Sequence, residues 1–172
     1  MIENFLDVGH FPFVHGGFLG DLSHTEVADY EVETGAEGIV ARDISVWQPD
    51  PDGTGQAALV KYTYKVPRPL TAYFLKSYQD QRFSIFCSVT PVEERESLAW
   101  LILALNYSPE TSDEQLCNFQ DFVSAQDIPI VESQRPELLP LDLQAELHLR
   151  SDRTAIAYRQ WLTKLGLKYG TA

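Results

Sequence analysis

Between residues 27 and 107, apolar and polar residues alternate along the chain with a period of two. From Ala58 to Val66 every second residue is apolar, and Lys61 and Lys65 lie between them, as expected for a strand with one buried face and one wetter face. The segment from Phe83 to Val89 alternates in the same way. Turn-forming residues separate these runs, so the region predicts about five or six strands in an antiparallel meander.

The run from Leu98 to Leu105 differs because it is apolar on both faces. A strand of this kind is normally covered on both sides, so we expect other parts of the protein to bury it. Cys87 falls on the apolar alternation of its own strand and is interpreted as a small buried hydrophobe.

Further along the chain, the period of the apolar residues changes to that of a helix. Ser112 is a suitable N-cap, and Pro129 is expected to kink or end the helix because its ring clashes with the carbonyl four residues earlier. One face of this helix would carry Leu116, Phe119, Val123, Asp127 and Ile130. A second helix is expected to begin near residues 151–152 and to stop at Gly166. Strands followed by helices predict an α+β fold, in which helices wrap a curved antiparallel sheet.

Composition narrows the class of protein. The chain has 172 residues, which suits one domain with its own core. Its formal net charge of -12 gives a surface that repels nucleic acids. No secretory signal is evident, and the longest apolar run is far shorter than the roughly 20 residues that span a bilayer. We therefore expect a single domain over residues 1–172, in the cytoplasm, with no nucleic-acid partner and no membrane span. Cys87 and Cys117 predict neither a disulfide nor a zinc site.

Two histidines, His10 and His15, lie five residues apart near the amino terminus. On one continuous helix they would point about 140° apart around the axis, so both can face one point only if the backbone leaves the helix between them. Pro12 is expected to supply that break. Gly16 and Gly17 would let a loop fold close behind His15.

A carboxylate is the second part of the candidate site. Asn4, Asp7 and His10 recur every three residues and are expected to share a helical face. Two imidazoles and one carboxylate form the ligand set of a facial-triad Fe(II) site, which leaves three positions free. Asp127 is the best candidate for the third ligand because it lies on the apolar stripe of its helix, whereas Asp121 does not. An inward Asp can also be a helix cap or a hydrogen-bonded core acid, and both alternatives stay open.

Other residues offer weaker candidates. His24 and His148 have no partner pattern and are interpreted as solvated or packing residues. Several aromatics could line a pocket for a flat ligand, although core packing is favoured for most of them: Phe11, Phe13, Phe18, Tyr73, Phe74, Phe83, Phe86 and Trp100.

The segment from Asn4 to His15 resembles the N-x-x-D-x-x-H-x-x-x-x-H motif of the catalytic domain of Rieske-type non-haem iron oxygenases, a family that includes vanillate demethylase and the pheophorbide-type enzymes. Residues 126–136 resemble the segment with the family's carboxylate ligand, and residues 152–162 resemble its closing helix. The resemblance therefore extends over nearly the whole chain.

This resemblance implies that His10, His15 and Asp127 bind Fe(II). It implies that Asp7 hydrogen-bonds a ligand histidine and helps to carry electrons in from a [2Fe-2S] cluster, with Asn4 nearby, so Asp7 and Asn4 are the expected catalytic residues beside the ligands. The implied fold is a helix grip of the START and Bet v 1 kind, in which a curved antiparallel sheet grips a long helix over an apolar cavity.

One departure from the family is large. Its cluster needs two Cys and two His in an amino-terminal domain, and this sequence has no C-x-H or C-x-x-H motif. We therefore expect no [2Fe-2S] cluster in this chain and a Rieske or ferredoxin-type electron donor that acts in trans. The donor would be a separate polypeptide, or a neighbouring subunit if the chain forms a homotrimer as the family does. Otherwise the chain is a split or truncated product with partial function.

The expected function is that of an oxidoreductase, a mono- or dioxygenase that uses O2 to hydroxylate or O-demethylate a small aromatic or hydrophobic substrate. Two alternatives stay open. One is a non-catalytic helix-grip protein that binds a hydrophobic ligand beside a vestigial metal site. The other is a hydrolase in which the metal activates water. Retention of the three ligand residues and Asp7 favours the oxygenase, whereas the absence of the cluster domain favours the binding protein.

Overall fold

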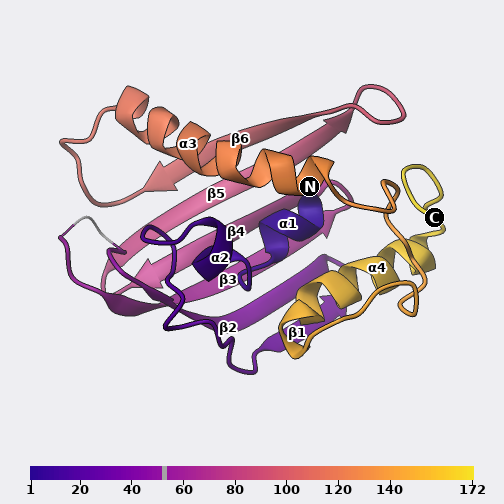
Figure 1. Cartoon of the computed structure of the whole chain (residues 1–172), viewed down its shortest axis with the longest axis horizontal. Helices are drawn as coiled ribbons and strands as arrows, with labels where there is room; N and C mark the ends of the chain where they lie inside the picture. The colour runs from indigo at the N-terminus through magenta and orange to yellow at the C-terminus, as the bar shows by residue number, and fades with distance from the viewer. Residues whose placement is uncertain (52–53) are drawn as a thin grey trace.

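The computed structural model describes residues 1–51 and 54–172. One antiparallel sheet of six strands has the order β1-β2-β3-β4-β5-β6, so each strand pairs with its neighbours in sequence (Figure 1). The strands are β1 (Glu31–Gly35), β2 (Gly38–Gln48), β3 (Ala58–Arg68), β4 (Thr71–Tyr78), β5 (Gln81–Pro91) and β6 (Ser97–Leu105). The helices are α1 (Ile2–Leu6), α2 (Phe11–Val14), α3 (Asp113–Glu132) and α4 (Arg153–Leu165), the last preceded by a 3-10 turn at Arg150–Asp152. The predicted meander and the α+β class are confirmed.

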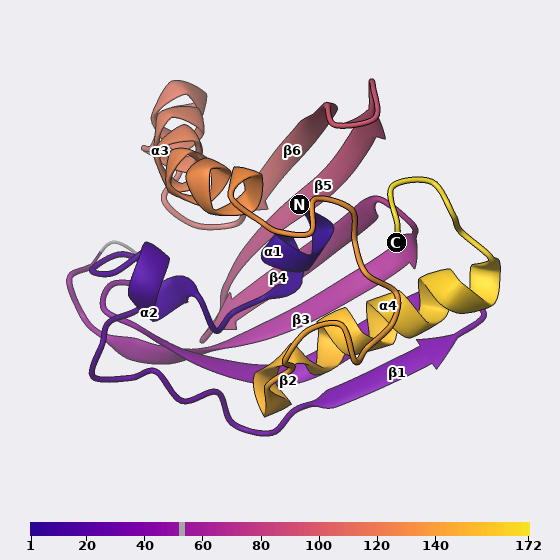
Figure 2. The same cartoon turned by 45° about the vertical axis from the view of Figure 1, so that its right-hand side comes forward.

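One face of the sheet provides the core. Alternate residues of β3 are buried as predicted, namely Val60, Tyr62, Tyr64 and Val66. Cys87 on β5 is fully buried, which confirms its interpretation as a core residue. The pairing register shifts between residues 41 and 44 of β2 and between residues 65 and 68 of β3. Bulges of this kind bend a strand and increase its twist, which contributes to the curvature of the sheet (Figure 2).

The helices lie over the same face of the sheet (Figures 1 and 2). α4 packs over β1 and β2, α1 lies over β4, and α3 lies on the side of β5 and β6. Tyr158 and Leu162 of α4 are buried against the sheet, and Gly166 ends the helix with φ of 70°, as predicted. Leu165, the last residue of the helix, is exposed.

The prediction that β6 is covered on both sides is wrong for the chain as described. Leu98, Trp100 and Ile102 are 50%, 59% and 64% exposed. β6 is the last strand of the meander and therefore an edge strand. Leu101 and Leu103, which alternate with these three residues, are partly buried against the core, so the three exposed side chains belong to the other face of the strand. A strand that is apolar on both faces is thus not necessarily covered on both faces by its own chain.

The prediction that Pro129 kinks or ends its helix is wrong in part, because α3 continues to Glu132. A proline inside a helix leaves the carbonyl four residues earlier without its donor, here that of Ala125. Ala125 is exposed, so water can hydrate this carbonyl and no buried hydrogen bond is lost. The predicted N-cap is confirmed, since the Ser112 side chain accepts a hydrogen bond from the Gln115 backbone.

The amino-terminal segment is fastened firmly to the body of the protein. Ile2 and Leu6 of α1 are buried in the core. Glu3 accepts two hydrogen bonds of 2.7 Å from the Arg159 guanidinium of α4, and Arg159 also forms a 2.6 Å ion pair with Glu146.

Within the described residues, no helix has the length and apolar character needed to cross a bilayer.

Candidate metal centre

The turn at residues 7–10 places the first histidine. α1 stops at Leu6, and Asp7 is extended, with φ of -84° and ψ of 132°. Its Oδ1 accepts the Gly9 N–H at 2.7 Å and its Oδ2 accepts the His10 N–H at 3.1 Å. A Cβ at position 9 would lie 3.1 Å from Asp7 Oδ1, so glycine leaves room for this turn. The prediction of a shared helical face for Asn4, Asp7 and His10 is wrong, because the helix breaks at Asp7 and the turn brings Asp7 to His10.

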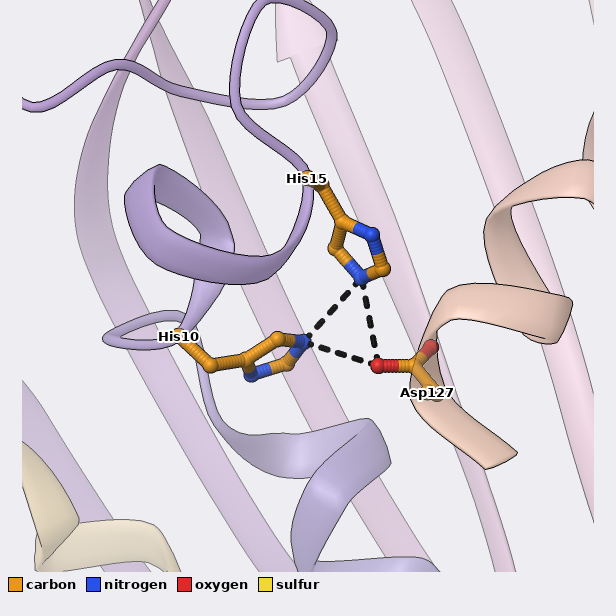
Figure 3. Close-up of side chains that lie close together, drawn as sticks. All are labelled: His10, His15 and Asp127. Carbon is orange, nitrogen blue, oxygen red and sulfur yellow. Dashed lines mark hydrogen bonds and ion pairs between the residues drawn. The ribbon is translucent and has the colours of Figure 1, made fainter. Parts of the chain in front are cut away.

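A second correction concerns Pro12, which does not interrupt the helix. It lies in the first turn of α2, where a helix needs no N–H donor. The chain instead leaves the helical region at His15, with φ of -108° and ψ of 34°. Behind His15, the Gly17 N–H donates to the Gly20 carbonyl and closes a tight loop. His10 and His15 therefore flank a single helical turn, and their rings meet beside it (Figure 3).

Helix α3 brings Asp127 to the two histidines (Figure 3). His10 Nε2 lies 3.3 Å from His15 Nε2. Asp127 Oδ1 lies 3.4 Å from His10 Nε2 and 3.2 Å from His15 Nε2. These three atoms thus form a group that could hold one metal ion. The structure brings together all three residues that the sequence suggested, although more than a hundred positions separate Asp127 from the two histidines.

Each of the three side chains has one further polar partner. Asp7 Oδ2 lies 3.0 Å from His10 Nδ1. Asn4 Nδ2 donates to Asp127 Oδ1 at 3.1 Å. Gln126 Oε1 lies 2.7 Å from His15 Nδ1. The sequence predicted Asp7 and Asn4 near the site, but it gave no signal for Gln126 other than its place beside Asp127.

These contacts decide where the ring protons lie. The carboxylate of Asp7 and the amide oxygen of Gln126 can only accept, so Nδ1 of each histidine is the donor. When the rings are neutral, both Nε2 atoms then present lone pairs, and they face each other and Asp127 Oδ1. Three electron-rich atoms at this separation repel one another unless a cation lies among them. The donor set therefore fits a metal ion.

Without a metal, a proton supplies part of this positive charge. Burial disfavours a charged His10, but hydrogen bonds to Asp127 and Asp7 outweigh it and raise the pKa of His10 to about 9. Burial likewise disfavours a charged Asp127, but hydrogen bonds with His10, His15 and Asn4 hold the pKa of this carboxyl far below its usual value. The pKa of Asp7 is also lowered, because its hydrogen bond with His10 outweighs burial. The site thus keeps its carboxylates ionised and attracts a cation.

Nitrogen and carboxylate donors in this number suit a divalent transition metal. Two imidazoles and one carboxylate on one side leave the opposite positions open, which is the ligand pattern of mononuclear Fe(II) oxygenases. Hydrogen bonds from Nδ1 to acceptors further out are the usual way in which proteins orient such imidazoles. Asp7 and Gln126 meet this requirement for the two histidines.

The other candidates lie outside this group. His24 stacks on Trp47 with ring centroids 4.0 Å apart and lies 3.1 Å from Asp21, near the surface. Among the aromatics, Phe11 and Phe74 are buried in the core, whereas Phe13 and Trp100 are exposed. The predicted core packing is therefore confirmed for Phe11 and Phe74 and wrong for Phe13 and Trp100.

Comparisons with known proteins point to one family. Residues 1–168 match the model of the vanillate O-demethylase oxygenase C-terminal domain. The chain is 36% identical over 177 residues to the probable methylxanthine N7-demethylase NdmC of Pseudomonas sp. (strain TJI-51), with 99% of this chain and 62% of the relative covered. It is 30% identical to the methylxanthine N1-demethylase NdmA of Pseudomonas putida, with 95% and 45% covered.

Solved structures agree. The structure of Pseudomonas putida CBB5 NdmA with caffeine matches with a TM-score of 0.76 and 28% identity, over 95% of this chain and 46% of that one. The chain thus spans less than two thirds of the length of these relatives. The matches extend over nearly the whole of this chain and include both segments that form the metal centre. The chain therefore belongs to the family of vanillate O-demethylase oxygenase C-terminal domains.

Proposed function

We propose that the chain is the catalytic domain of a Rieske-type oxygenase in which His10, His15 and Asp127 bind Fe(II). The observation that supports this most strongly is the convergence of two imidazole Nε2 atoms and one carboxylate oxygen, on three side chains that each have a further polar partner. Bound there, Fe(II) would supply open coordination positions for dioxygen. Asp7 holds the Nδ1 proton of His10, and Asn4 orients the carboxylate of Asp127.

The proposed reaction is oxidative removal of a methyl group from a flat heteroaromatic compound. The relatives NdmC and NdmA are named as methylxanthine demethylases, and NdmA has been solved with caffeine. Oxidation of an N-methyl or O-methyl group to formaldehyde consumes one O2, two electrons and two protons, with water as the second product. Hydroxylation of an aromatic ring draws on the same reactants. The substrate would bind in an apolar cavity beneath a helix.

The electrons come from a [2Fe-2S] protein outside this stretch of sequence. The chain has two cysteines, Cys87 on β5 and Cys117 on α3, and neither belongs to a C-x-H or C-x-x-H motif of the kind that holds such a cluster. Asp7 lines a surface hollow with Phe13, residues 25–27 and residues 149–152. This hollow and the contact of Asp7 with His10 support an entry point for electrons on that side. A neighbouring subunit of a trimer or a separate polypeptide would dock there.

We also place the protein in the cytoplasm, since both cysteines are free thiols and such thiols persist in a reducing compartment.

Metal analysis is the first test. Protein purified anaerobically and supplied with Fe(II) is expected to hold about one iron per chain. If no iron binds even after reconstitution, the chain is a ligand-binding protein rather than an oxygenase.

Turnover is the second test. With a reductase-fed [2Fe-2S] donor and methylxanthines, we expect formaldehyde to form in step with O2 consumption. Turnover that needs no reductant would instead indicate a hydrolase.

Asp7→Asn tests the path of the electrons. The variant is expected to keep iron and to lose turnover by roughly 100-fold, because the partner of His10 is no longer an anion. Asp21→Asn is the matched control, since Asp21 contacts His24 in the same way outside the site. Equal turnover in the two variants would remove Asp7 from the proposed path.

A further inference from the structure

The contact between Gln126 and His15 joins two segments that are far apart in sequence. Gln126 lies on α3 directly before Asp127, and its Oε1 is 2.7 Å from His15 Nδ1. In return, Asn4 of α1 donates to Asp127 at 3.1 Å. In both contacts a group on the amino-terminal segment faces an oxygen on α3, and each segment holds a proposed metal ligand of the other.

His15 depends on this contact because its ring is enclosed. The side chain of His15 is 1% exposed, so water cannot readily serve as the partner of its Nδ1 atom. Within the described residues, the hydrogen-bond acceptor that faces Nδ1 is Gln126 Oε1. A buried ring nitrogen without a partner would be costly.

We propose that Gln126 is a positioning residue that holds the proton of His15 on Nδ1 and so leaves Nε2 free to bind the metal. This inference rests on the proposed metal site, but it concerns the protein before the metal arrives. It adds a requirement on α3, which must deliver an amide acceptor as well as a carboxylate.

Two arrangements of the site compete. In the first, which fits the observed contact of the Gln126 oxygen with Nδ1, the proton lies on Nδ1 and Nε2 presents its lone pair beside Asp127. In the other, Nδ1 is unprotonated and the proton lies on Nε2, where Asp127 Oδ1 at 3.2 Å would accept it. The second arrangement satisfies Asp127 but blocks the nitrogen that the metal needs. The orientation of the Gln126 amide favours the first arrangement, because the atom that faces Nδ1 is the amide oxygen, which can only accept, whereas the NH2 group would have to face Nδ1 in the second.

Three variants separate this effect from packing. Gln126→Leu keeps similar volume and removes the acceptor. Gln126→Glu keeps the acceptor oxygen and, as a carboxylate, can only accept. Gln120→Leu is the control, because Gln120 is on the same helix and donates to Ser124 instead of contacting His15.

The first measurement is ¹⁵N NMR of the histidine rings in the metal-free proteins. We expect the His15 proton on Nδ1 in the wild type, in Gln126→Glu and in Gln120→Leu, and on Nε2 in Gln126→Leu. A wild-type His15 with its proton on Nε2, or a Gln126→Leu variant with the wild-type tautomer, would overturn the inference. The state of His15 can be read without any metal, so this result does not depend on the proposed function.

The second measurement is Co(II) affinity, obtained by competition with a chelator. Gln126→Leu is expected to bind Co(II) roughly 10–100-fold more weakly than the wild type, whereas Gln126→Glu restores the affinity. If Gln126→Glu loses as much affinity as Gln126→Leu, the acceptor is not what matters and the inference fails. If the wild type itself binds no metal while the tautomers follow the expected pattern, the proposed function fails and the positioning of His15 stands.

Discussion

Helices α3 and α4 both lie over the sheet, yet they are held in different ways. α4 buries Thr154, Tyr158, Arg159 and Leu162. α3 is longer, and within its described length Val123 is the buried residue. Contacts of α3 are also found at the candidate metal centre and in an aromatic cluster of Phe18 with Phe119 and Phe122. The two histidines proposed as ligands therefore belong to a firmly packed part of the protein, the sheet with α1, α2 and α4, which we call the wall. The third proposed ligand, Asp127, lies on a lightly packed helix.

This difference separates stability from metal binding. Substitutions in the wall should unfold the protein, whereas substitutions on α3 should weaken the site and leave the wall folded. Four experiments test that division.

The largest effect is expected for Asp127→Ala, which should abolish iron binding because the two imidazoles that remain provide no anionic ligand. Circular dichroism should show that the sheet is intact, and metal analysis gives the iron content. Asp121→Ala is the control, since Asp121 is an exposed acid on the same helix. Retained iron in Asp127→Ala would refute the assignment of this ligand.

Next in size is the stability contrast between the helices. Tyr158→Ala should cost about 3–5 kcal/mol of unfolding free energy, because it empties a buried aromatic site. Phe119→Ala on α3 should cost about 1–2 kcal/mol, because the ring is half exposed and loses one ring contact with Phe18. Urea denaturation measures both values. Similar losses would show that α3 is as tightly packed as α4.

The third experiment uses pH. In the metal-free protein the pKa of His10 is raised from 6.5 to about 9, because contacts with Asp127 and Asp7 outweigh burial. This stabilisation is complete below pH 6.5 and is lost as the pH rises through about 9. We expect the unfolding free energy to fall by at most about 3 kcal/mol over that window.

A saturating divalent metal should abolish this alkaline loss, since the ion replaces the proton. His10→Asn should also remove it, because no titrating ring remains. An alkaline loss of the same size in His10→Asn would assign the effect to another group.

The smallest effect concerns the aromatic cluster. Phe18→Ala removes two ring contacts to α3, each worth about 0.5–1.5 kcal/mol. Amide hydrogen exchange in α3 should become about tenfold faster, while exchange in α4 stays unchanged. Phe13→Ala serves as the control, because Phe13 is exposed on α2. Equal acceleration in both helices would show that they open together.

Much of the fold follows from periodicity alone. The alternation on β3 and β5 predicted their buried faces because side chains of a strand point alternately to its two sides. The stripe on α3 predicted that Asp127 points inward, and the N-cap at Ser112 set the start of that helix. The proximity of His10, His15 and Asp127 could be predicted because a metal site demands particular side chains, which limits the candidates to few positions.

Other features depend on contacts that a pattern does not encode. The turn at Asp7 arises from two backbone hydrogen bonds to one carboxylate. Gln126 was missed because an amide acceptor has no characteristic spacing from the histidine that it serves. The exposure of Trp100 was missed because an apolar sequence favours burial of a strand face but does not specify what covers that face.

The packing of α3 also bears on the order in which the holoprotein is assembled. The wall that holds His10 and His15 has its own core, so it should fold before any ion is present. Iron would then be the last component to arrive, and it would draw the carboxylate of Asp127 toward two nitrogens already in place. We expect a chelator to strip the metal, and ferrous salt to return it, without passage through the unfolded chain.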